Sequence, residues 1–505
     1  MQYGFAIDQR TCIGCHACTV ACKTEHEIPV GQFRTWVKYV DSGTFPDSAR
    51  SYGVMRCNHC TDAPCITICP TNSLFKREDG IVDFDGDLCI GCKSCQQACP
   101  YDAIYIDDNT NTAAKCNFCA HRVDSGLEPA CVVVCPTHSI WVGDLDDPDS
   151  GISQLLAGEP TLVRAPEQKT KPNVVYLGAS ISVLDPLAAP VDASYYSSTP
   201  DPHRAALAAE LPPTDAKTTL NTAHPRPWGW RVSTYLWTKA VGAGALMVAA
   251  LAHLLGVDLG VGGSLVAPAL GVVMTAATGV LLVWDLKRPD RFYYILTKPN
   301  PRSWLFWGSL ALAAFAGVAG LYLVTGLVGE LSSYDVDPIV TVLAWLALPT
   351  GALAAGYTAF LFGQAEGRDL WQSRLLLPVL QVQAVMVGAG ALVLAGSYDD
   401  AAGAFLVRFL VGAAALHVVL LLVEFLRPQH SAQATAAAGL VVRGRYAALF
   451  WWVAIGGAVF AVALAAPSWD GTPWATVVLA GIAVQGVLLT YESVFVRAGQ
   501  DIPLS

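Results

Sequence analysis

Sixteen cysteines, all between positions 12 and 135, constrain this 505-residue chain more than any other feature. They form four groups of four, and the first and third groups share the spacing C-x2-C-x2-C-x3-C. A proline follows the last cysteine of the second, third and fourth groups. The groups are Cys12, Cys15, Cys18 and Cys22; Cys57, Cys60, Cys65 and Cys69; Cys89, Cys92, Cys95 and Cys99; and Cys116, Cys119, Cys131 and Cys135.

This spacing predicts iron–sulfur clusters. Three thiolates spaced by two residues can hold three irons of one cluster, while the fourth ligand comes from another motif. Thiolates are soft donors that suit such clusters. Structural zinc sites typically use two Cys-x2-4-Cys pairs, so the repeated C-x2-C-x2-C-x3-C motif disfavours zinc. Disulfide scaffolds belong to oxidising compartments and do not require metal-ligand spacing, so they are disfavoured as well. Sixteen grouped cysteines predict four [4Fe–4S] clusters.

Other polar residues lie within or beside the cysteine groups. Each group already supplies four thiolates, so we interpret His16 and His59 as neighbours of the clusters rather than ligands. Three lysines are adjacent to cysteines: Lys23, Lys93 and Lys115. Their positive charge would tune the reduction potential of a cluster, or alternatively their side chains extend into solvent.

The chain after residue 230 has a different composition, without cysteine and with few charges. Apolar stretches of about 20 residues recur there, each long enough to cross a membrane as a helix. They predict an all-α membrane domain of eight transmembrane helices, near 237–257, 264–285, 304–326, 338–361, 375–396, 403–426, 446–466 and 474–495.

Residues 1–185 are expected to form an α+β cysteine-rich domain, with strand-like segments at 80–84, 103–106 and 173–177. Residues 186–230 are rich in Pro, Ala, Asp, Ser and Thr without clear periodicity, which predicts a linker. Residues 231–505 complete the chain as the membrane domain. The soluble part is acidic and would repel nucleic acid.

Loop charges predict the orientation in the membrane. The loops on the N-terminal side hold Arg226, Arg231, Lys239, Lys287, Arg288, Arg291, Lys298, Arg302, Arg368, Arg374, Arg427, Arg443, Arg445 and Arg497. The opposite loops hold Asp258, Glu330, Asp335, Asp337, Asp399, Asp400 and Asp470, without Lys or Arg. The positive-inside rule then places both termini and the cysteine domain in the cytoplasm. Residues 1–10 lack the apolar core of a secretory signal, which agrees with a cytoplasmic location of the cysteine domain.

The cysteine groups, with the long gap in the last, resemble the four-cluster electron-transfer subunits of the molybdopterin oxidoreductase (dimethyl-sulfoxide reductase) superfamily. The resemblance spans residues 1 to about 180 and includes 135–137 and 171–176. It implies a double ferredoxin-like fold and a separate molybdenum or tungsten bis-pterin catalytic subunit. It also implies crossed ligand sets: Cys12, Cys15, Cys18 and Cys135; Cys22, Cys116, Cys119 and Cys131; Cys57, Cys60, Cys65 and Cys99; and Cys69, Cys89, Cys92 and Cys95.

Residues 285–291, 300–308, 364–371 and 376–378 resemble the NrfD-like (polysulfide-reductase membrane subunit) family, which usually has Gly where Lys287 stands. This resemblance covers about 231–495. It implies eight helices, no haem and a quinone site near the iron–sulfur subunit. His253 and His417 are the only histidines in the predicted spans, so a haem ligated by two of them is the weaker alternative.

Polar residues in membrane spans are functional candidates. Those near the N-terminal side are Tyr235, Lys239, Asp285, Gln364 and Glu492, and snorkelling at a helix end is the alternative for Lys239 and Glu492. We take Tyr235, Lys239, Asp285 and Gln364 as the quinone-site candidates. Asp285 is the expected proton acceptor, or else the partner of a cationic neighbour.

The sequence therefore favours an iron–sulfur subunit fused to its membrane anchor. Such a chain would pass electrons between the catalytic pterin subunit and membrane quinone, with menaquinone the expected type. A redox-driven proton- or ion-translocating module is the alternative, although it requires a membrane-crossing chain of acids and histidines. A sensor or scaffold would not need four clusters.

Overall fold

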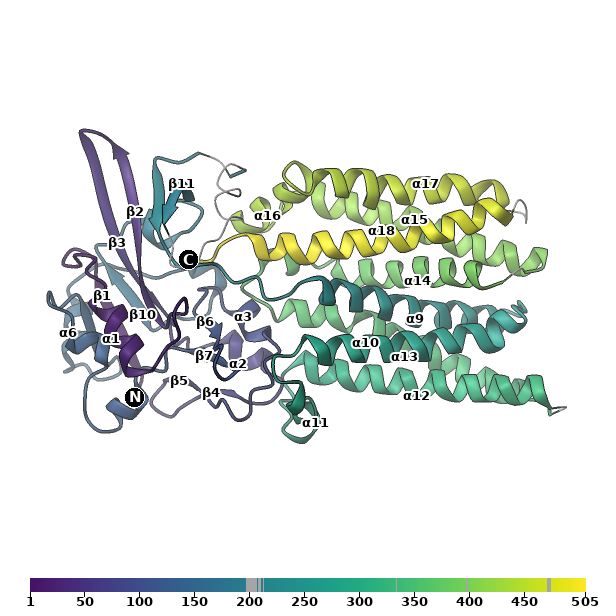
Figure 1. Ribbon diagram of the computed structural model, residues 1–505, viewed down its shortest axis with the longest axis horizontal. Helices are drawn as coiled ribbons and strands as arrows, with labels where there is room; N and C mark the ends of the chain where they lie inside the picture. The colour runs from purple at the N-terminus through teal and green to yellow at the C-terminus, as the bar shows by residue number, and fades with distance from the viewer. Residues whose placement is uncertain (197–206, 208–209, 212, 333, 397, 470–473) are drawn as a thin grey trace.

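The computed structural model describes residues 1–505 except 197–206, 208–209, 212, 333, 397 and 470–473. Strands and short helices form one end of an elongated molecule, and a bundle of long helices forms the other (Figure 1). This arrangement confirms the predicted order of a small α+β domain followed by an all-helical domain. Asp470, one of the predicted loop acids, lies outside the described residues.

The N-terminal domain is organised around one four-stranded sheet. Its central strand β1 (Tyr3–Asp8) pairs antiparallel with β8 (Ile140–Asp144) and parallel with β10 (Val174–Leu177). The short β9 (Thr161–Leu162) completes the order β8-β1-β10-β9. Phe5, Ile7 and Tyr176 are fully buried, so this sheet contributes the core on which the first and last cysteine groups rest.

Two small hairpins carry the middle cysteine groups. Strand β4 (Leu74–Lys76) pairs with β5 (Val82–Phe84), and β6 (Ile104–Ile106) pairs with β7 (Ala113–Lys115). Short helices start within or after the cysteine groups: α1 (Ala17–Glu25), α2 (Pro64–Ile68), α3 (Ser94–Ala98), α4 (Ala120–Val123) and α5 (Ala130–Val133). The three strand-like segments expected from the sequence coincide with β5, β6 and β10. Helices α6 (Gly151–Ala157) and α7 (Ile181–Leu184) complete the domain.

The segment 186–230, expected to be a linker, contributes two strands. A long hairpin of β2 (Thr35–Thr44) and β3 (Asp47–Arg56) is extended by β12 (Ala216–Leu220) and β11 (Val191–Tyr196), in the order β11-β12-β2-β3. The free edge of β2 offers unpaired backbone groups, and β12 satisfies them by antiparallel pairing. Part of this segment therefore belongs to the sheet, while 197–206 lie outside the described residues.

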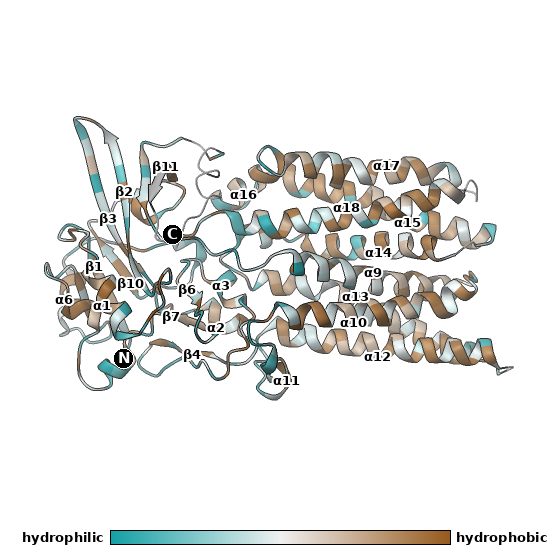
Figure 2. Cartoon of the chain, viewed as in Figure 1, coloured by the Kyte–Doolittle hydropathy of each residue, from teal (hydrophilic) through white to brown (hydrophobic). Residues whose placement is uncertain are grey.

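Within the described chain, eight helices are long and apolar enough to cross a membrane, as predicted. Figure 2 shows the apolar residues that run along them. Seven of them are α9 (Trp230–Leu254), α10 (Ala267–Asp285), α12 (Trp304–Leu331), α13 (Asp337–Gly363), α14 (Leu376–Ala395), α15 (Asp400–Leu426) and α18 (Trp474–Asp501). The remaining span, Leu449–Ser468, consists of α17 (Gly456–Ala465) and the helical turns that flank it. π-Helical turns, Gly262–Val266 and Leu449–Ile455, lead into α10 and α17. The short α11 (Tyr294–Thr297) and α16 (Ala432–Val442) lie between long helices.

Helix α9 is the centre of the bundle. It packs against α10, α13, α14 and α18, and most of its span is buried inside the protein. Glycine permits the closest of these approaches, because a Cβ atom added to Gly244 of α9 would lie 1.7 Å from the carbonyl oxygen of Ala384 in α14. Small residues at such crossings let helix backbones touch, as is common in membrane bundles.

The loops at one end of the bundle hold the N-terminal domain. Asn300 Nδ2 donates to the carbonyl of Cys69 (2.7 Å) and Ser303 Oγ to that of Ile68 (2.7 Å). The backbone N–H of Lys287 donates to the carbonyl of Gly91 at 3.1 Å. These bonds join helix-connecting loops directly to the backbone around cysteine groups two and three, which fixes the distance between the domains.

Candidate functional site

The four cysteine groups share one backbone shape although their sequences differ. In each group the residue before the second cysteine has a positive φ: Gly14 (69°), His59 (43°), Gly91 (66°) and Phe118 (64°). Glycine adopts this conformation without steric cost, but histidine and phenylalanine do not. The surrounding structure therefore holds the second and fourth groups in a turn for which their sequences give no signal.

Folding gathers cysteines from different groups into common sites. One small cavity is lined by Cys12, Cys15, Cys18 and Cys135. Electrostatic interactions connect Cys22 with Cys116, Cys119 and Cys131; Cys65 with Cys57, Cys60 and Cys99; and Cys95 with Cys69, Cys89 and Cys92. Neighbouring sets also interact, through the pairs Cys65–Cys95, Cys57–Cys116 and Cys18–Cys131. The four sets are the crossed sets that the family resemblance implies, and iron ligation by them stays a prediction.

The polar atoms around these sets fit a sulfur-rich group. Backbone N–H groups point at thiols: Gly91 and Ala113 donate to Cys89 Sγ (3.4 and 3.3 Å), and Ser139 donates to Cys135 Sγ (3.3 Å). The Asn58 side-chain Nδ2 is a buried donor without an acceptor among the described residues. None of the sixteen cysteines, which all lie in described residues, is disulfide-bonded. A buried donor requires an acceptor, which cluster sulfur would supply.

His26 is a neighbour of these sets that the sequence analysis missed. Its Nε2 lies 3.2 Å from Cys119 Sγ. Burial lowers the pKa of His26 to about 4, so its ring is neutral at physiological pH. His26 comes four residues after Cys22, outside any C-x2-C turn, and only the fold brings it to the fourth group.

The histidines and lysines noted from the sequence contact other groups of the protein. His16 Nε2 lies 3.1 Å from the Tyr39 hydroxyl, and His59 Nδ1 accepts the Val82 N–H at 3.2 Å. Lys23 Nζ donates to two backbone carbonyls. Lys115 is fully buried, and its Nζ donates to the Cys116 carbonyl at 2.9 Å.

An apolar cavity of about 280 Å³ lies where the third cysteine group meets the bundle. Cys92 lies on one side of it, and residues of α9, α10, α12 and α13 form the others. Its polar groups are few, which is typical of small-molecule sites. The main lining residues are Cys92, Ser94, Trp228, Val232, Tyr235, Leu282, Asp285, Phe292, Leu305, Ser309, Leu312, Tyr357 and Leu361.

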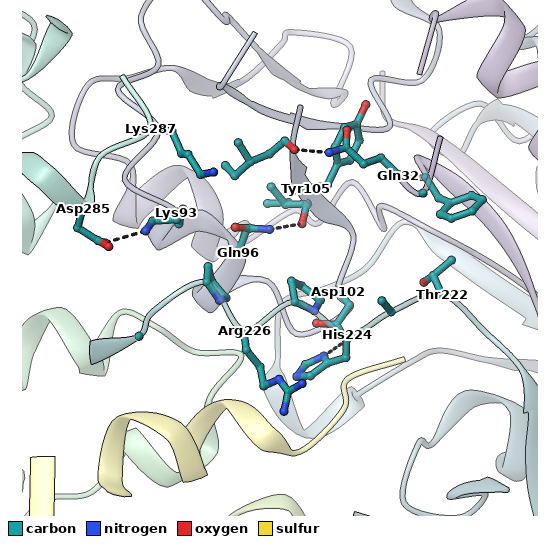
Figure 3. Close-up of a pocket in the computed structure, with 18 of the residues that line it drawn as sticks. Gln32, Lys93, Gln96, Asp102, Tyr105, Thr222, His224, Arg226, Asp285 and Lys287 are labelled. Atoms are coloured by element: carbon teal, nitrogen blue, oxygen red, sulfur yellow. Dashed lines mark hydrogen bonds and ion pairs between the residues drawn. The ribbon is translucent and has the colours of Figure 1, made fainter. Parts of the chain in front are cut away.

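A second cavity of about 630 Å³, with more polar groups in its lining, adjoins the first and is called the polar cavity (Figure 3). Asp285 lines both cavities. Its Oδ2 accepts an ion-paired hydrogen bond of 2.7 Å from Lys93 Nζ, and Arg231 lies 3.9 Å from its Oδ1. Because Lys93 follows Cys92 in the chain, one ion pair joins the third cysteine group to the end of α10. Asp285 thus has the cationic partner expected for it.

The structure brings two of the four quinone-site candidates to the apolar cavity, Tyr235 and Asp285. Lys239 lies deeper in α9, where its Nζ donates to the Ala355 carbonyl at 2.8 Å and to Thr358 Oγ1. Gln364 lies outside the cavity, because its amide joins two neighbouring loops: Oε1 accepts from the Trp304 N–H and Nε2 donates to the Arg302 carbonyl. Glu492 is buried in α18.

Trp228, Ser309 and Tyr357 are among the lining residues that were not predicted. Tyr357 is in the middle of an apolar run, and the sequence does not show which side of α13 faces the cavity. Of the span histidines, His253 Nε2 lies 2.9 Å from Thr341 Oγ1, and His417 packs edge-on against Tyr491. Arg408 is exposed on α15, 5.9 Å from the Trp469 ring.

Comparison with known proteins agrees with this architecture. The family model "Polysulphide reductase, NrfD" matches residues 218–502, more than half of the chain. The protein belongs to the NrfD family. A second model, "4Fe-4S dicluster domain", matches residues 50–145. The chain therefore joins an iron–sulfur domain and a multi-pass NrfD membrane domain, as the two resemblances predicted.

Relatives of the iron–sulfur part are subunits of reductases. A tetrathionate reductase subunit of Salmonella typhimurium is 43% identical over 190 residues, which cover 37% of this chain and 76% of that protein. A polysulfide reductase subunit of Wolinella succinogenes is 43% identical over 176 residues, covering 34% and 92%. The arsenate respiratory reductase iron-sulfur subunit ArrB of Shewanella sp. is 36% identical over 225 residues, covering 35% and 96%. This NrfD-family protein is accordingly an electron-transfer and membrane-anchoring subunit of an oxidoreductase complex.

Proposed function

We propose that the chain passes electrons between a molybdenum or tungsten bis-pterin catalytic subunit and membrane quinone, through four [4Fe–4S] clusters. The observation that carries this proposal is the apolar cavity that Cys92 and Asp285 share at the domain junction. A cluster held by Cys69, Cys89, Cys92 and Cys95 would border the cavity directly. An electron would therefore cross from this cluster to a bound ring without passing through a lipid layer.

The cavity has the properties that a quinone headgroup requires. Its volume of about 280 Å³ lies just below the roughly 300–1,000 Å³ typical of ligand sites, which suits a headgroup whose tail stays in lipid. Its walls are mostly apolar, whereas Tyr235, Ser309 and Tyr357 offer hydroxyl groups to a quinone carbonyl. The cavity lies at the ends of membrane spans, where a ligand with an isoprenoid tail enters from lipid.

Asp285 is the proposed proton carrier. Reduction of a quinone to a quinol takes two electrons and two protons, one proton for each carbonyl oxygen. The adjacent cluster would deliver the two electrons one at a time and be re-reduced by the other clusters between the two transfers. The Asp285 carboxyl faces the apolar cavity on one side and the polar cavity on the other. It can pass protons between water and the quinone oxygen in either direction, and Lys93 holds it in place at 2.7 Å.

The opposite end of the iron–sulfur domain is the proposed docking side for the catalytic subunit. Cys15 is exposed there, next to Ile13 (56% exposed) and near Val133 (62% exposed) in the fourth group. Exposed apolar residues beside a cluster favour a protein partner that covers them. The named relatives are likewise subunits of reductases. The substrate site would then lie on that separate chain.

Replacement of Asp285 with Asn tests the quinone site, because Asn keeps the shape but cannot carry the proton. In purified holo-protein, electron transfer from dithionite-reduced clusters to a soluble menaquinone analogue should slow at least about tenfold, since proton transfer by a positioned group contributes about 10²–10⁴-fold. Iron content and the extent of cluster reduction should stay unchanged. Asp290→Asn is the matched control, because Asp290 is exposed and outside the cavity. Full quinone activity in Asp285→Asn would refute the proposed site.

A further inference from the structure

Arg56 is a buried cation at the centre of the iron–sulfur domain. It is the last residue of β3, directly precedes Cys57, and has 0% of its surface exposed. Its Nη1 donates to Cys131 Sγ at 3.3 Å, and its guanidinium stacks over the Phe5 ring at 4.3 Å. Its Nε and Nη2 have no hydrogen-bond acceptor among the described residues. Two buried donors thus remain for the sulfur atoms of a cluster.

The charge of Arg56 is not balanced by a carboxylate. Within the described parts of the chain, no ion pair includes it, and most of the groups that interact with it electrostatically are thiols. It interacts electrostatically with all four cysteines of one crossed set, Cys22, Cys116, Cys119 and Cys131, and with Cys18 of the adjacent set. An arginine stays protonated in proteins, and a buried charge without a counter-charge is strongly unfavourable.

The other basic residues beside cysteines are satisfied differently. Lys93 is paired with the Asp285 carboxylate. Lys23 and Lys115 donate to backbone carbonyls. His59, which lies near Arg56, is fully buried, and burial keeps its ring neutral by lowering its pKa. Lys23 and Lys115 each also interact electrostatically with a thiol, Cys22 and Cys65 respectively. Arg56 differs from both in donating a hydrogen bond to a thiol and in interacting with five thiols.

We propose that Arg56 is the shared counter-ion of the two clusters furthest from the membrane, and that its positive charge raises their reduction potentials. This inference rests on the proposed cluster ligation but not on the quinone site. Reduction adds one negative charge to a cluster, so a fixed cation beside it favours the reduced state. Because Arg56 interacts with four thiols of one set and one of the other, the cluster of Cys22, Cys116, Cys119 and Cys131 should depend on it more strongly.

The test is a potentiometric titration of purified holo-protein, followed by the EPR signals of the reduced clusters. Arg56→Gln should lower one midpoint potential by about 59 mV, which is a tenfold change in the ratio of reduced to oxidised cluster for a one-electron couple. A second cluster should shift in the same direction by less. Arg56→Lys keeps the charge and should retain potentials near those of the unmodified protein. Arg164→Gln is the control for the loss of a buried guanidinium, because Arg164 donates to the Leu504 carbonyl instead of a thiol.

Four unchanged midpoints in an Arg56→Gln protein with full iron content would overturn the inference, as would an equal shift in Arg56→Lys. If Arg56→Gln fails to assemble its clusters, the Arg56→Lys variant tests the inference in its place. Normal cluster content and potentials in Arg56→Lys support a role for charge, and failure of this variant as well contradicts it. If the unmodified chain holds fewer than four clusters, the proposed function fails instead, and iron analysis before titration separates the two failures.

Discussion

At the scale of single residues, Gly91 links the cluster domain to the membrane domain. Its φ is +66°, and a Cβ atom there would lie 2.5 Å from Lys287 Cβ and 2.9 Å from the Asn111 carbonyl oxygen. Its own carbonyl accepts the Lys287 N–H. Gly91 thus serves the cysteine turn and the junction together.

Gly91→Ala should destabilise the protein through both effects. The left-handed backbone costs about 1–2 kcal/mol for a residue with a Cβ atom, and the collision adds about 1–3 kcal/mol. Gly126→Ala is the matched control, because Gly126 has φ +74° but nothing within 4 Å of the added atom. Thermal unfolding in detergent, followed by loss of cluster absorbance, should show a larger fall in the transition temperature for Gly91→Ala. Equal transition temperatures would show that the contact with Lys287 is unimportant.

The sequence predicts residues of this site unevenly, and the reason is geometric. The depth of a residue along a helix can be read from hydropathy, so Tyr235 and Asp285 were placed near the correct end of their spans. The side of the helix that a residue occupies depends on packing, so Tyr357 was missed. Gln364 does not line the cavity for a related reason, since its amide joins two loops whose contact only the fold creates.

At the scale of elements, the contact between α9 and α14 depends on two glycines. A Cβ atom on Gly244 would lie 1.7 Å from the Ala384 carbonyl oxygen, and one on Gly388 would lie 2.1 Å from the Gly244 carbonyl carbon. These atoms belong to backbone, which cannot yield as a side chain can. Any larger residue at either position must separate the two helices.

Gly244→Ala should therefore disrupt the bundle, and the junction cavity with it, because Tyr235 lies on the same helix. We expect a loss of about 1–3 kcal/mol or more from overpacking. Gly320→Ala in α12 is the control, because nothing lies within 4 Å of the added atom and alanine favours helix. The fraction of monodisperse protein after detergent extraction, measured against temperature, should fall for Gly244→Ala and not for Gly320→Ala. A Gly244→Ala protein as stable as the control would mean that α14 moves without cost.

Element prediction succeeded where one physical effect dominates. Long apolar runs have few alternatives to a membrane helix, so all eight helices were found. Strands β11 and β12 were missed because their segment resembles a linker in composition and gains its order from the edge of β2. Helix α16 was missed because eleven residues are too few to span a membrane.

At the scale of the whole molecule, the iron–sulfur domain lies against the basic ends of the bundle. Arg291 Nη1 donates to the Gly86 carbonyl at 2.7 Å, and Arg368 Nε donates to Gln97 Oε1 at 2.7 Å. Lys239, counted among the loop cations in the sequence, lies instead inside the bundle. Arg291 and Arg368 thus hold the iron–sulfur domain in addition to adding positive charge to the loops. Domain contact and membrane topology are therefore two separate reasons for the excess of basic residues at this end of the bundle.

The orientation of the molecule follows from the loop charges as a prediction. If the positive-inside rule holds, the iron–sulfur domain is cytoplasmic and the acidic loops face outward. Asp335→Cys adds an exposed thiol to an acidic loop, and Asp290→Cys adds one to a basic loop. A membrane-impermeant maleimide should label Asp335→Cys in intact cells and Asp290→Cys only after the membrane is opened. The sixteen native cysteines set the background, which the unmodified chain measures. The arginines that dock the iron–sulfur domain would lie beside it in either orientation of the protein. If maleimide labels Asp290→Cys in intact cells and Asp335→Cys only in opened ones, the iron–sulfur domain faces outward. The uneven distribution of basic residues would then be explained by docking and not by the positive-inside rule.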